Sequence, residues 1–304
     1  MQSQLSKNIL NTIIYYDILN FPLTSFEVWK YLLAENSYTL GEIIESLEDD
    51  ELKKYTEEFR GFYFLKGRKD LVARRIQNDK NSIEKFEIAQ RAAQWLRFVP
   101  FVRMIALTGT LAMKNCEKNS DIDFLVILEK DRIFTGRLFV TAMVHFLGKR
   151  RHGEKIKNRI CLNYFVAAES LEIQRKDLFA ANEYSFIYPL FDNDVFQKFC
   201  ETNIGWIKKI KPNWRIPDLK PARYCVEHSR ISLSIQKSFE SLINMMRGDR
   251  IESWQKHKQI TRIERNPLTK KEGAYIEYTD ENLIFLPEPQ GVRVEKEFQR
   301  RLNS

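Results

Sequence analysis

The chain has no uncharged apolar run that approaches the roughly 20 residues needed to span a membrane as a helix. Its opening segment, MQSQLSKNIL, also lacks the apolar core of a secretion signal. These two absences predict a cytoplasmic protein without a membrane partner. Hydrophobic residues make up 43% of the 304 positions and charged residues 30%, which excludes a disordered chain and leaves room for two or three domains.

Cysteine and histidine, which supply most disulfide frameworks and zinc sites, are few. The sequence holds four of each: Cys116, Cys161, Cys200, Cys225, His145, His152, His228 and His257. No two cysteines are spaced as C-x-x-C, and no histidines as H-E-x-x-H. We therefore expect buried free thiols rather than disulfides, and no metal site built from histidine.

The positive charge of the chain is unevenly distributed. The net charge of +8 favours an anionic partner such as a nucleotide or a nucleic acid. Residues 1–78 contain 10 Lys and Arg against 12 Asp and Glu, a net charge of −2. The whole positive excess therefore lies beyond residue 78.

Residues 1–79 show the pattern of a winged-helix-like domain. Apolar residues at helical spacing predict helices over residues 5–18, 25–33 and 39–59. Residues 61–76 then predict two short strands around the turn KGRKD. Three helices followed by a hairpin resemble a winged helix, a fold that often binds DNA through its third helix.

The charge of the third predicted helix disfavours sequence-specific DNA binding, because carboxylates in a groove would repel the phosphates. The acidic residues of this segment are Glu42, Glu45, Glu48, Asp49, Asp50 and Glu51. The predicted wing is basic and offers phosphate contacts through Lys66, Arg68, Lys69, Arg74 and Arg75. A packing or protein-contact role is favoured over the reading of a DNA sequence.

Residues 80–175 alternate between helical and extended patterns and predict an α/β core. A helix over 80–98 joins this core to the first domain. The elements expected next are a strand at 102–110, a short helix at 111–116, a strand at 121–128, a long helix at 131–151 and a strand at 159–167.

Residues 176–304 predict a mostly helical domain with a C-terminal hairpin. Helices are expected over 176–191, 193–210, 226–248 and 292–304, and the two strands of the hairpin over 274–280 and 282–288. Three prolines within 211–223 predict an extended connector. The predicted fold class is α+β: a winged-helix-like domain, a core of a short mixed sheet flanked by helices, and a helical C-terminal domain.

Two carboxylates stand at the beginning of the predicted strand 121–128. Residues i and i+2 of a strand point to the same side, so Asp121 and Asp123 converge on one space while Ile122 and Phe124 point into a core. A divalent cation removes the repulsion between two such carboxylates. Mg²⁺ typically takes one or two carboxylates together with phosphate oxygens and water.

Gly109 and Thr110 end the preceding strand and begin a short predicted helix. A glycine lets the backbone approach a ligand closely, free N–H groups at a helix start bind anions, and the Thr110 hydroxyl adds a donor. This segment offers phosphate donors and the next strand offers metal ligands, a combination that suits a metal-bound nucleoside triphosphate.

The pair GT at 109–110, followed by SDIDFLVI at 120–127, resembles the motif of the DNA polymerase beta-type nucleotidyltransferase superfamily. The predicted order of helices and strands around it agrees, and the resemblance covers residues 80–170. It implies transfer of a nucleoside monophosphate from a nucleoside triphosphate to an acceptor hydroxyl or another nucleophile, with pyrophosphate leaving. The helical segment that follows resembles the substrate-side domain that such enzymes often carry.

The resemblance also implies roles for individual residues. Asp121 and Asp123 would hold Mg²⁺, with Mn²⁺ as the alternative, and ATP is the default nucleotide. The residues that would contact the nucleotide are Gly109, Thr110, Lys114, Ser120, Arg150 and Arg151. The last two lie in the basic loop 148–159, whose other charges we expect to be solvated.

A third acidic residue usually stands on a later strand in this family, beside the first two. The matching strand here is 159–167, and its inward position is expected to be Asn163, which can ligate a metal weakly but cannot act as a base. Glu169 and Glu183 are the alternative carboxylates. Four aromatic residues are expected to pack in the core, with base stacking as the minor alternative: Tyr184, Phe186, Tyr188 and Phe191. Tyr164 is expected on the strand face opposite Asn163 and in the core as well.

Three functions remain open from the sequence. The first is a Mg²⁺-dependent nucleotidyltransferase whose acceptor is a small molecule, a protein side chain or an RNA end. The second is a non-catalytic nucleotide-binding or regulatory protein on the same scaffold, which Asn163 favours. The third is a DNA-binding winged-helix regulator, which the acidic third helix disfavours.

Overall fold

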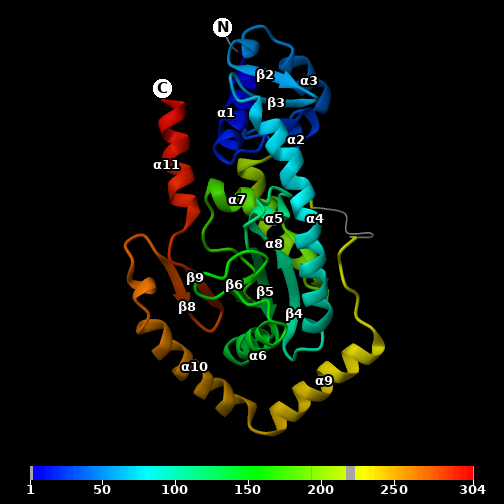
Figure 1. Cartoon of the computed structure of the whole chain (residues 1–304), viewed down its shortest axis with the longest axis vertical. Helices are drawn as coiled ribbons and strands as arrows, with labels where there is room; N and C mark the ends of the chain where they lie inside the picture. Colours follow the sequence, from blue (N-terminus) through cyan, green and yellow to red (C-terminus); the bar gives the residue numbers. More distant parts are fainter. Residues whose placement is uncertain (1–2, 193, 217–222, 304) are drawn as a thin grey trace.

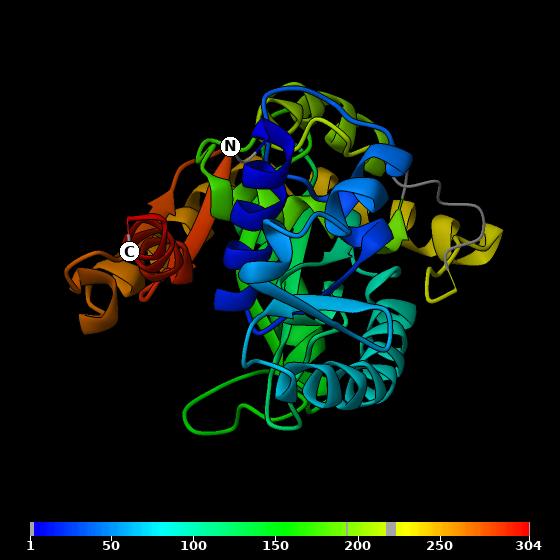
Figure 2. The ribbon, with the colours of Figure 1, turned by 90° about the horizontal axis from the view of Figure 1, so that it is seen from above.

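The computed structural model describes residues 3–192, 194–216 and 223–303, and within these ranges the chain has an α+β fold. Its described strands form two sheets, one of three strands and one of six. Figure 1 shows the three-stranded sheet at one end of the molecule, on the same side as the C-terminal helix α11 (Gln290–Leu302), and the six-stranded sheet in the middle. Figure 2 views the molecule along its long axis, with α1 and the small sheet in front.

Three helices and an antiparallel sheet of order β1-β3-β2 form the N-terminal part. The elements are α1 (Gln4–Ile18), β1 (Leu23–Thr24), α2 (Ser25–Lys30), α3 (Leu40–Leu47), the 3₁₀ helix η1 (Leu52–Lys54), β2 (Thr56–Phe59) and β3 (Phe62–Leu65). Thr24 and Thr39 cap α2 and α3, each in a capping box with the glutamate three residues further on, Glu27 and Glu42. These caps fix where both helices begin.

The predicted position of the hairpin in this part is wrong. β2 and β3 pair around Arg60 and Gly61, both of which have positive φ, and not around KGRKD. The segment 71–76, predicted as the second strand, belongs to α4 (Asp70–Leu96), a helix of 27 residues. The apolar pair Leu71 and Val72 fits the buried side of a first helical turn as well as it fits a short strand, so this segment is ambiguous from sequence alone.

The central sheet has the strand order β7-β4-β5-β6-β9-β8. Its middle strands are β4 (Val102–Leu107), β5 (Ile122–Leu128) and β6 (Ile160–Ala167), joined by α5 (Gly109–Ala112) and α6 (Ile133–Phe146). β5 and β6 are parallel and the other neighbouring pairs are antiparallel, which makes the sheet mixed. The outer strands β7 (Tyr188–Asp192), β8 (Tyr275–Tyr278) and β9 (Asn282–Leu286) come from the last part of the chain.

Alternation along β5 gives the sheet two buried faces. Phe124 and Val126 belong to the apolar cluster that contains the buried residues of α4 and α6. Leu125 and Ile127 belong to the other cluster, which contains residues of α1, α7 (Leu178–Ser185) and α8 (Phe196–Ile210). Asp123 has the parity of this second face, so its carboxylate points toward α7.

Beyond residue 176 the structure differs from the predicted helical pattern in two places. The helix predicted over 176–191 ends at Ser185, and the edge strand β7 follows it. Pro189 has no backbone N–H to donate to a neighbouring strand, and an edge strand tolerates this because one of its sides is unpaired. After α9 (Arg230–Met245) comes α10 (Gly248–Glu264), a helix that the sequence analysis did not predict, and then the 3₁₀ helix η2 (Pro267–Lys270). Of the predicted connector 211–223, residues 217–222 lie outside the described residues.

Helices α9 and α10 form a V around the end of the central sheet, next to α6 (Figure 1). The β8–β9 hairpin predicted near the C-terminus pairs with β6 and so extends the central sheet. Among the described residues, none of the helices combines the length and the apolarity that crossing a membrane requires.

Candidate functional site

A cavity of about 630 Å³ lies where β4 ends and β5 begins. Residues of α5, β5, β6 and α7 form one side of it, and the segment 268–291 contributes the other. The sequence-predicted site residues that line it are Gly109, Thr110, Asp121, Asp123, Arg151 and Asn163. The structure therefore brings together the two segments that carry the sequence motif.

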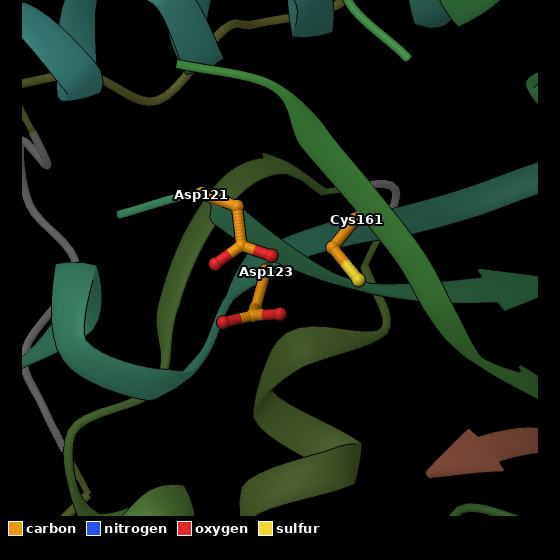
Figure 3. A group of neighbouring side chains, drawn as sticks. All are labelled: Asp121, Asp123 and Cys161. Carbon is orange, nitrogen blue, oxygen red and sulfur yellow. The ribbon is translucent and has the colours of Figure 1, made fainter. Parts of the chain in front are cut away.

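Asp121 and Asp123 point into this cavity from the start of β5 (Figure 3). Between and after them, Ile122 and Phe124 are fully buried on the opposite face of the sheet. The two carboxylates and the Sγ atom of Cys161 each offer one ligand atom, and these atoms lie within 4.8 Å of one another. A cation of ordinary coordination distance fits among three such donors.

At position 109, a residue larger than glycine would clash with the carboxylate of Asp123. The φ of Gly109 is +64°, and a Cβ atom built there would lie 2.8 Å from Oδ2 of Asp123. The backbone N–H of Thr108 also donates to the carbonyl oxygen of Asp123 at 3.2 Å. The close approach of the two motif segments thus depends on a glycine at 109, for both conformational and steric reasons.

The carboxyl group of Asp123 holds its proton more tightly than an ordinary aspartic acid. Burial raises its pKa to about 7, and the neighbouring charges of Asp121 and Glu183 add to the rise. Arg151 and a hydrogen bond from Cys161 act in the opposite direction without cancelling it. A bound cation would relieve this excess of negative charge, which is the electrostatic condition for a metal site.

Glu183, from α7, lines the cavity beside the two aspartates, and the carboxylates of Asp177 and Glu288 line it as well. Glu183 accepts hydrogen bonds from the Thr108 hydroxyl and from the backbone N–H of Gly109, and burial raises its pKa to about 7. Glu169, the other alternative considered from the sequence, forms an ion pair with Lys130 at 2.7 Å and does not line the cavity. The candidate third carboxylate therefore comes from a helix, and not from the neighbouring strand.

The register between β5 and β6 decides which residue of β6 lies beside the aspartates. Asp123 pairs with Cys161, so Cys161 occupies the position beside the carboxylates that was expected for Asn163. Leu125 pairs with Tyr164, so β6 has one extra residue after Cys161, and this bulge gives Tyr164 the parity of Asp123. Asn163 still lines the cavity, and so does Tyr164, which the sequence analysis placed on the opposite face.

Arg151 is the basic residue in direct contact with the motif. Its Nη1 atom donates to Oδ2 of Asp121 at 2.5 Å and lies 3.5 Å from Sγ of Cys161. The other predicted nucleotide contacts, Lys114, Ser120 and Arg150, do not line the cavity. Positive φ at Lys114 turns the chain just after α5, and its side chain is exposed.

Lys85 is a buried cation that the sequence analysis did not single out. Its Nζ atom donates at 2.7 Å to the carbonyl of Ser120 and to Oδ1 of Asn158. It thus ties the residue just before Asp121 to the basic loop that carries Arg151. A lone lysine in an amphipathic helix gives no sequence signal for this role, because the pattern does not show what lies opposite it.

The lining of the cavity also includes aromatic rings and two further cations, namely Tyr164, Tyr184, Tyr275, Phe285, Arg175 and Lys271. Arg175 pairs with Asp177 and Lys271 with Glu288, and both of these carboxylates line the same cavity. Of the four aromatics considered between 184 and 191, only Tyr184 lines the cavity; Phe186, for example, stacks on Tyr31 with ring centroids 4.2 Å apart. Aromatic faces next to cations suit a ligand that has both a flat ring and negative charge.

Comparison with known proteins returned no family model, no curated protein and no solved structure that matches the chain.

Proposed function

We propose that this protein is a Mg²⁺-dependent nucleotidyltransferase that transfers a nucleoside monophosphate from a nucleoside triphosphate to an acceptor nucleophile. The observation that carries the proposal is the contact between the two motif segments, where a Cβ at position 109 would lie 2.8 Å from Oδ2 of Asp123. The proposed architecture is a winged-helix-like N-terminal domain, a nucleotidyltransferase core around β4, β5 and β6, and a C-terminal substrate-side part.

In this proposal the carboxylates hold the cation and the surrounding donors hold the triphosphate. Asp121 and Asp123 are the ligands for Mg²⁺ or Mn²⁺, and Cys161 stands at the third position around them. The cation, when bound, neutralises the charge that develops on the transferred phosphoryl group. The N–H of Gly109, the Thr110 hydroxyl and the guanidinium of Arg151 are the phosphate donors, and the three residues that carry them line the cavity. The Thr110 hydroxyl lies 3.4 Å from Sγ of Cys116 and must turn from that contact to reach a phosphate.

The reaction itself requires an in-line displacement at the α-phosphorus. The acceptor oxygen forms a bond to the α-phosphorus, the bond from that phosphorus to the bridging oxygen breaks, and pyrophosphate leaves. We assign the acceptor proton to the carboxylate of Glu183, whose pKa of about 7 suits a base at neutral pH. Glu183 must release the Gly109 N–H for this role, which frees that donor for a phosphate oxygen.

The test uses nucleoside triphosphates labelled at the α or the γ position, with Mg²⁺ and a cell extract as the source of acceptor. The proposal predicts label on an acceptor from the α position only, released pyrophosphate, and loss of both in Asp123→Asn. Transfer from the γ position would identify a kinase instead, and release of label to water alone would identify a hydrolase. Arg91→Gln, at an exposed position of α4, serves as the matched surface control.

A nucleotide-binding protein without turnover is the second candidate, and two observations favour it. Cys161 occupies the strand position beside Asp123, and Arg151 already pairs with Asp121. Mg²⁺-dependent nucleotide binding in the absence of any α-label transfer would support this candidate.

For the N-terminal part we propose a packing or protein-contact role rather than DNA reading. Glu42 and Glu45 of α3 are exposed, and Glu48, at its C-terminal end, pairs with Lys53 on the surface. Salt-sensitive duplex binding that persists without the Asp121 and Asp123 carboxylates would contradict this role.

A further inference from the structure

Helix α10 packs against α6 at the end of the central sheet (Figure 1), and three arginines gather at this contact. They are Arg137 of α6, Arg150 of the basic loop 148–159 and Arg262 of α10. Burial lowers the pKa of Arg137 to about 10, and the positive charges of Arg150 and Arg262 add to this decrease. Burial and the charge of Arg262 also lower the pKa of Arg150. The three guanidinium groups therefore lie close enough to repel one another.

No carboxylate balances this charge within the part of the chain that the structure describes. None of the three arginines forms an ion pair there, and no carboxylate raises the pKa of Arg137 or Arg150. Two other half-buried arginines, Arg75 and Arg103, each pair with a glutamate. Uncompensated positive charge is the electrostatic condition for binding an anion.

The guanidinium group of Arg137 is oriented by its neighbours but is not fully hydrogen-bonded. Its Cζ atom lies 4.5 Å from the ring centre of Phe285 and 5.7 Å from that of Phe165. Its Nη1 atom donates to Oε1 of Gln259 at 2.7 Å. Its Nε atom is buried and has no hydrogen-bond partner among the described residues. Such a donor needs an acceptor, and the edge formed by Nε and Nη2 can hold two oxygens of an oxyanion side by side.

Gln259 fixes this geometry before any ligand binds. Its Nε2 atom donates to the carbonyl of Phe134 at 2.8 Å, which leaves its Oε1 atom directed at Arg137. Arg262 follows three residues later on the same side of α10. Because Arg262 is exposed and Arg150 is half-buried, an anion can reach the cluster from solvent.

We infer that Arg137, Arg150 and Arg262 form a binding site for a phosphate group, separate from the proposed nucleotide cavity. None of the three lines that cavity, whereas Arg151, the next residue in the chain, lines it and pairs with Asp121. A phosphate group carries about two negative charges at neutral pH together with several acceptor oxygens, and the planar fork of arginine matches its geometry. A carboxylate has less charge and fewer oxygens and suits three arginines less well. The inference does not rest on the proposed function.

Packing alone does not account for the cluster. The rings of Phe165 and Phe285 explain why the side chain of Arg137 lies against the sheet, but they do not require two further arginines beside it. Like charges at close range oppose folding, and a bound phosphate removes their repulsion. If packing were the whole explanation, Arg150→Gln would stabilise the protein equally with and without phosphate.

The first test measures thermal unfolding of the full chain in EDTA, with increasing inorganic phosphate compared with chloride of equal ionic strength. A ligand of the folded state raises the unfolding temperature, and the rise gives its affinity. We expect phosphate to stabilise the wild type, and we expect Arg137→Met and Arg262→Gln to weaken its binding about tenfold or more. Arg250→Gln, exposed near the other end of α10, removes the same charge from the same helix and should bind phosphate as the wild type does.

The second test separates this site from the nucleotide cavity. Arg151→Gln removes the arginine that lines the cavity, one residue from Arg150, and should leave the response to phosphate unchanged. Loss of the response in Arg151→Gln, with retention in Arg137→Met, would place the phosphate in the cavity and overturn the inference. Because the measurement is made in EDTA and needs no turnover, its result is the same whether or not the protein is a nucleotidyltransferase.

A third measurement identifies the source of the phosphate group. A fluorescent single-stranded RNA, titrated into the same variants at several salt concentrations, tests a nucleic-acid backbone. Binding that weakens in Arg137→Met and Arg262→Gln but not in Arg250→Gln assigns the site to RNA phosphates, and a response to inorganic phosphate alone assigns it to a free phosphate. No response of the wild type to either probe, or equal responses of all variants, would overturn the inference.

Discussion

At the residue scale, Gly109 shows most clearly how the two motif segments depend on each other. Its backbone conformation favours glycine, and the space that a Cβ would need is occupied by the carboxylate of Asp123. Sequence spacing could predict that Gly109 and the aspartates meet, because strand alternation places Asp121 and Asp123 on one side. It could not predict how close the approach is.

Gly109→Ala is expected to destabilise the fold by about 1–3 kcal/mol, through left-handed backbone strain and displacement of Asp123. The matched control is Gly61→Ala, since Gly61 has a φ of +78° but no atom lies within 4 Å of the methyl carbon that alanine would add. Urea unfolding of both variants measures the difference, and Mn²⁺ binding should weaken only in Gly109→Ala. Equal losses of stability and intact Mn²⁺ binding would show that Asp123 tolerates the methyl group.

Cys161 is the residue whose place the sequence could not predict. Cys161 and Asn163 have the same parity on a regular strand, so alternation does not tell which of them lies level with Asp123, and the register of β6 against β5 decides for Cys161. The bulge after Cys161 is equally unmarked in the sequence RICLNYFVA. A thiol beside two carboxylates changes which metals the site prefers, because sulfur is a soft ligand.

We predict that Cd²⁺ binds the wild type with the ultraviolet charge-transfer absorption of a cadmium–thiolate bond. Cys161→Ser should abolish that absorption and weaken Cd²⁺ binding more than about tenfold, or about 1.4 kcal/mol. Cys225→Ser, at another half-buried cysteine, is the control and should leave both unchanged. Retention of the absorption in Cys161→Ser would place the metal elsewhere.

At the element scale, the core strands are better defined by the sequence than the helices around them. β4, β5 and β6 are apolar apart from one residue each (Arg103, Asp123 and Asn163), and their observed bounds lie within the predicted ranges. The prediction of a helix over 176–191 is wrong for its second half, where Tyr188, Pro189 and Phe191 belong to the edge strand β7. α10 was missed because it buries only a few residues and has no apolar stripe to reveal it.

We expect that Glu240 attaches α9 to the segment around Phe101 and Arg103, and replacing Glu240 by alanine tests this. Glu240→Ala deprives the Phe101 N–H and the Arg103 guanidinium of an acceptor in a mostly buried contact. We expect a loss of about 1–3 kcal/mol in the free energy of unfolding and faster proteolysis within α9. Glu227→Ala, at an exposed glutamate, is the control for urea unfolding. Unchanged stability in Glu240→Ala would mean that the polar side of α9 does not hold it in place.

At the scale of the whole molecule, Lys211 connects the N-terminal part to the core. Its fully buried Nζ atom lies 2.9 Å from both the Tyr16 hydroxyl of α1 and Oδ1 of Asn182 in α7. The ammonium also lies 5.2 Å from the centre of the Tyr31 ring. Burial lowers the pKa of Lys211 well below its ordinary value. No sequence pattern predicts such a contact between segments so far apart in the chain.

This lowered pKa has a defined consequence for stability. In the unfolded chain Lys211 is protonated up to about pH 10.4, so between its folded and unfolded pKa the unfolded state binds more protons. The free energy of unfolding should therefore rise with pH between the lowered pKa of folded Lys211 and about pH 10.4, by up to about 1.4 kcal/mol per pH unit. Lys211→Met should lack this contribution, whereas Lys209→Met, exposed on α8, should retain it. Parallel pH profiles for the wild type and Lys211→Met would contradict the account.

The central claim of the proposal is that the cavity lined by Gly109, Asp121 and Asp123 binds a nucleoside triphosphate through a divalent cation. Calorimetric titration of ATP into the protein, with Mn²⁺ or with EDTA, tests this claim without any knowledge of the acceptor. The account predicts binding that requires the cation and is lost in the Asp121→Asn/Asp123→Asn double variant while the fold is retained. Binding of equal strength in EDTA, or in the double variant, would contradict it.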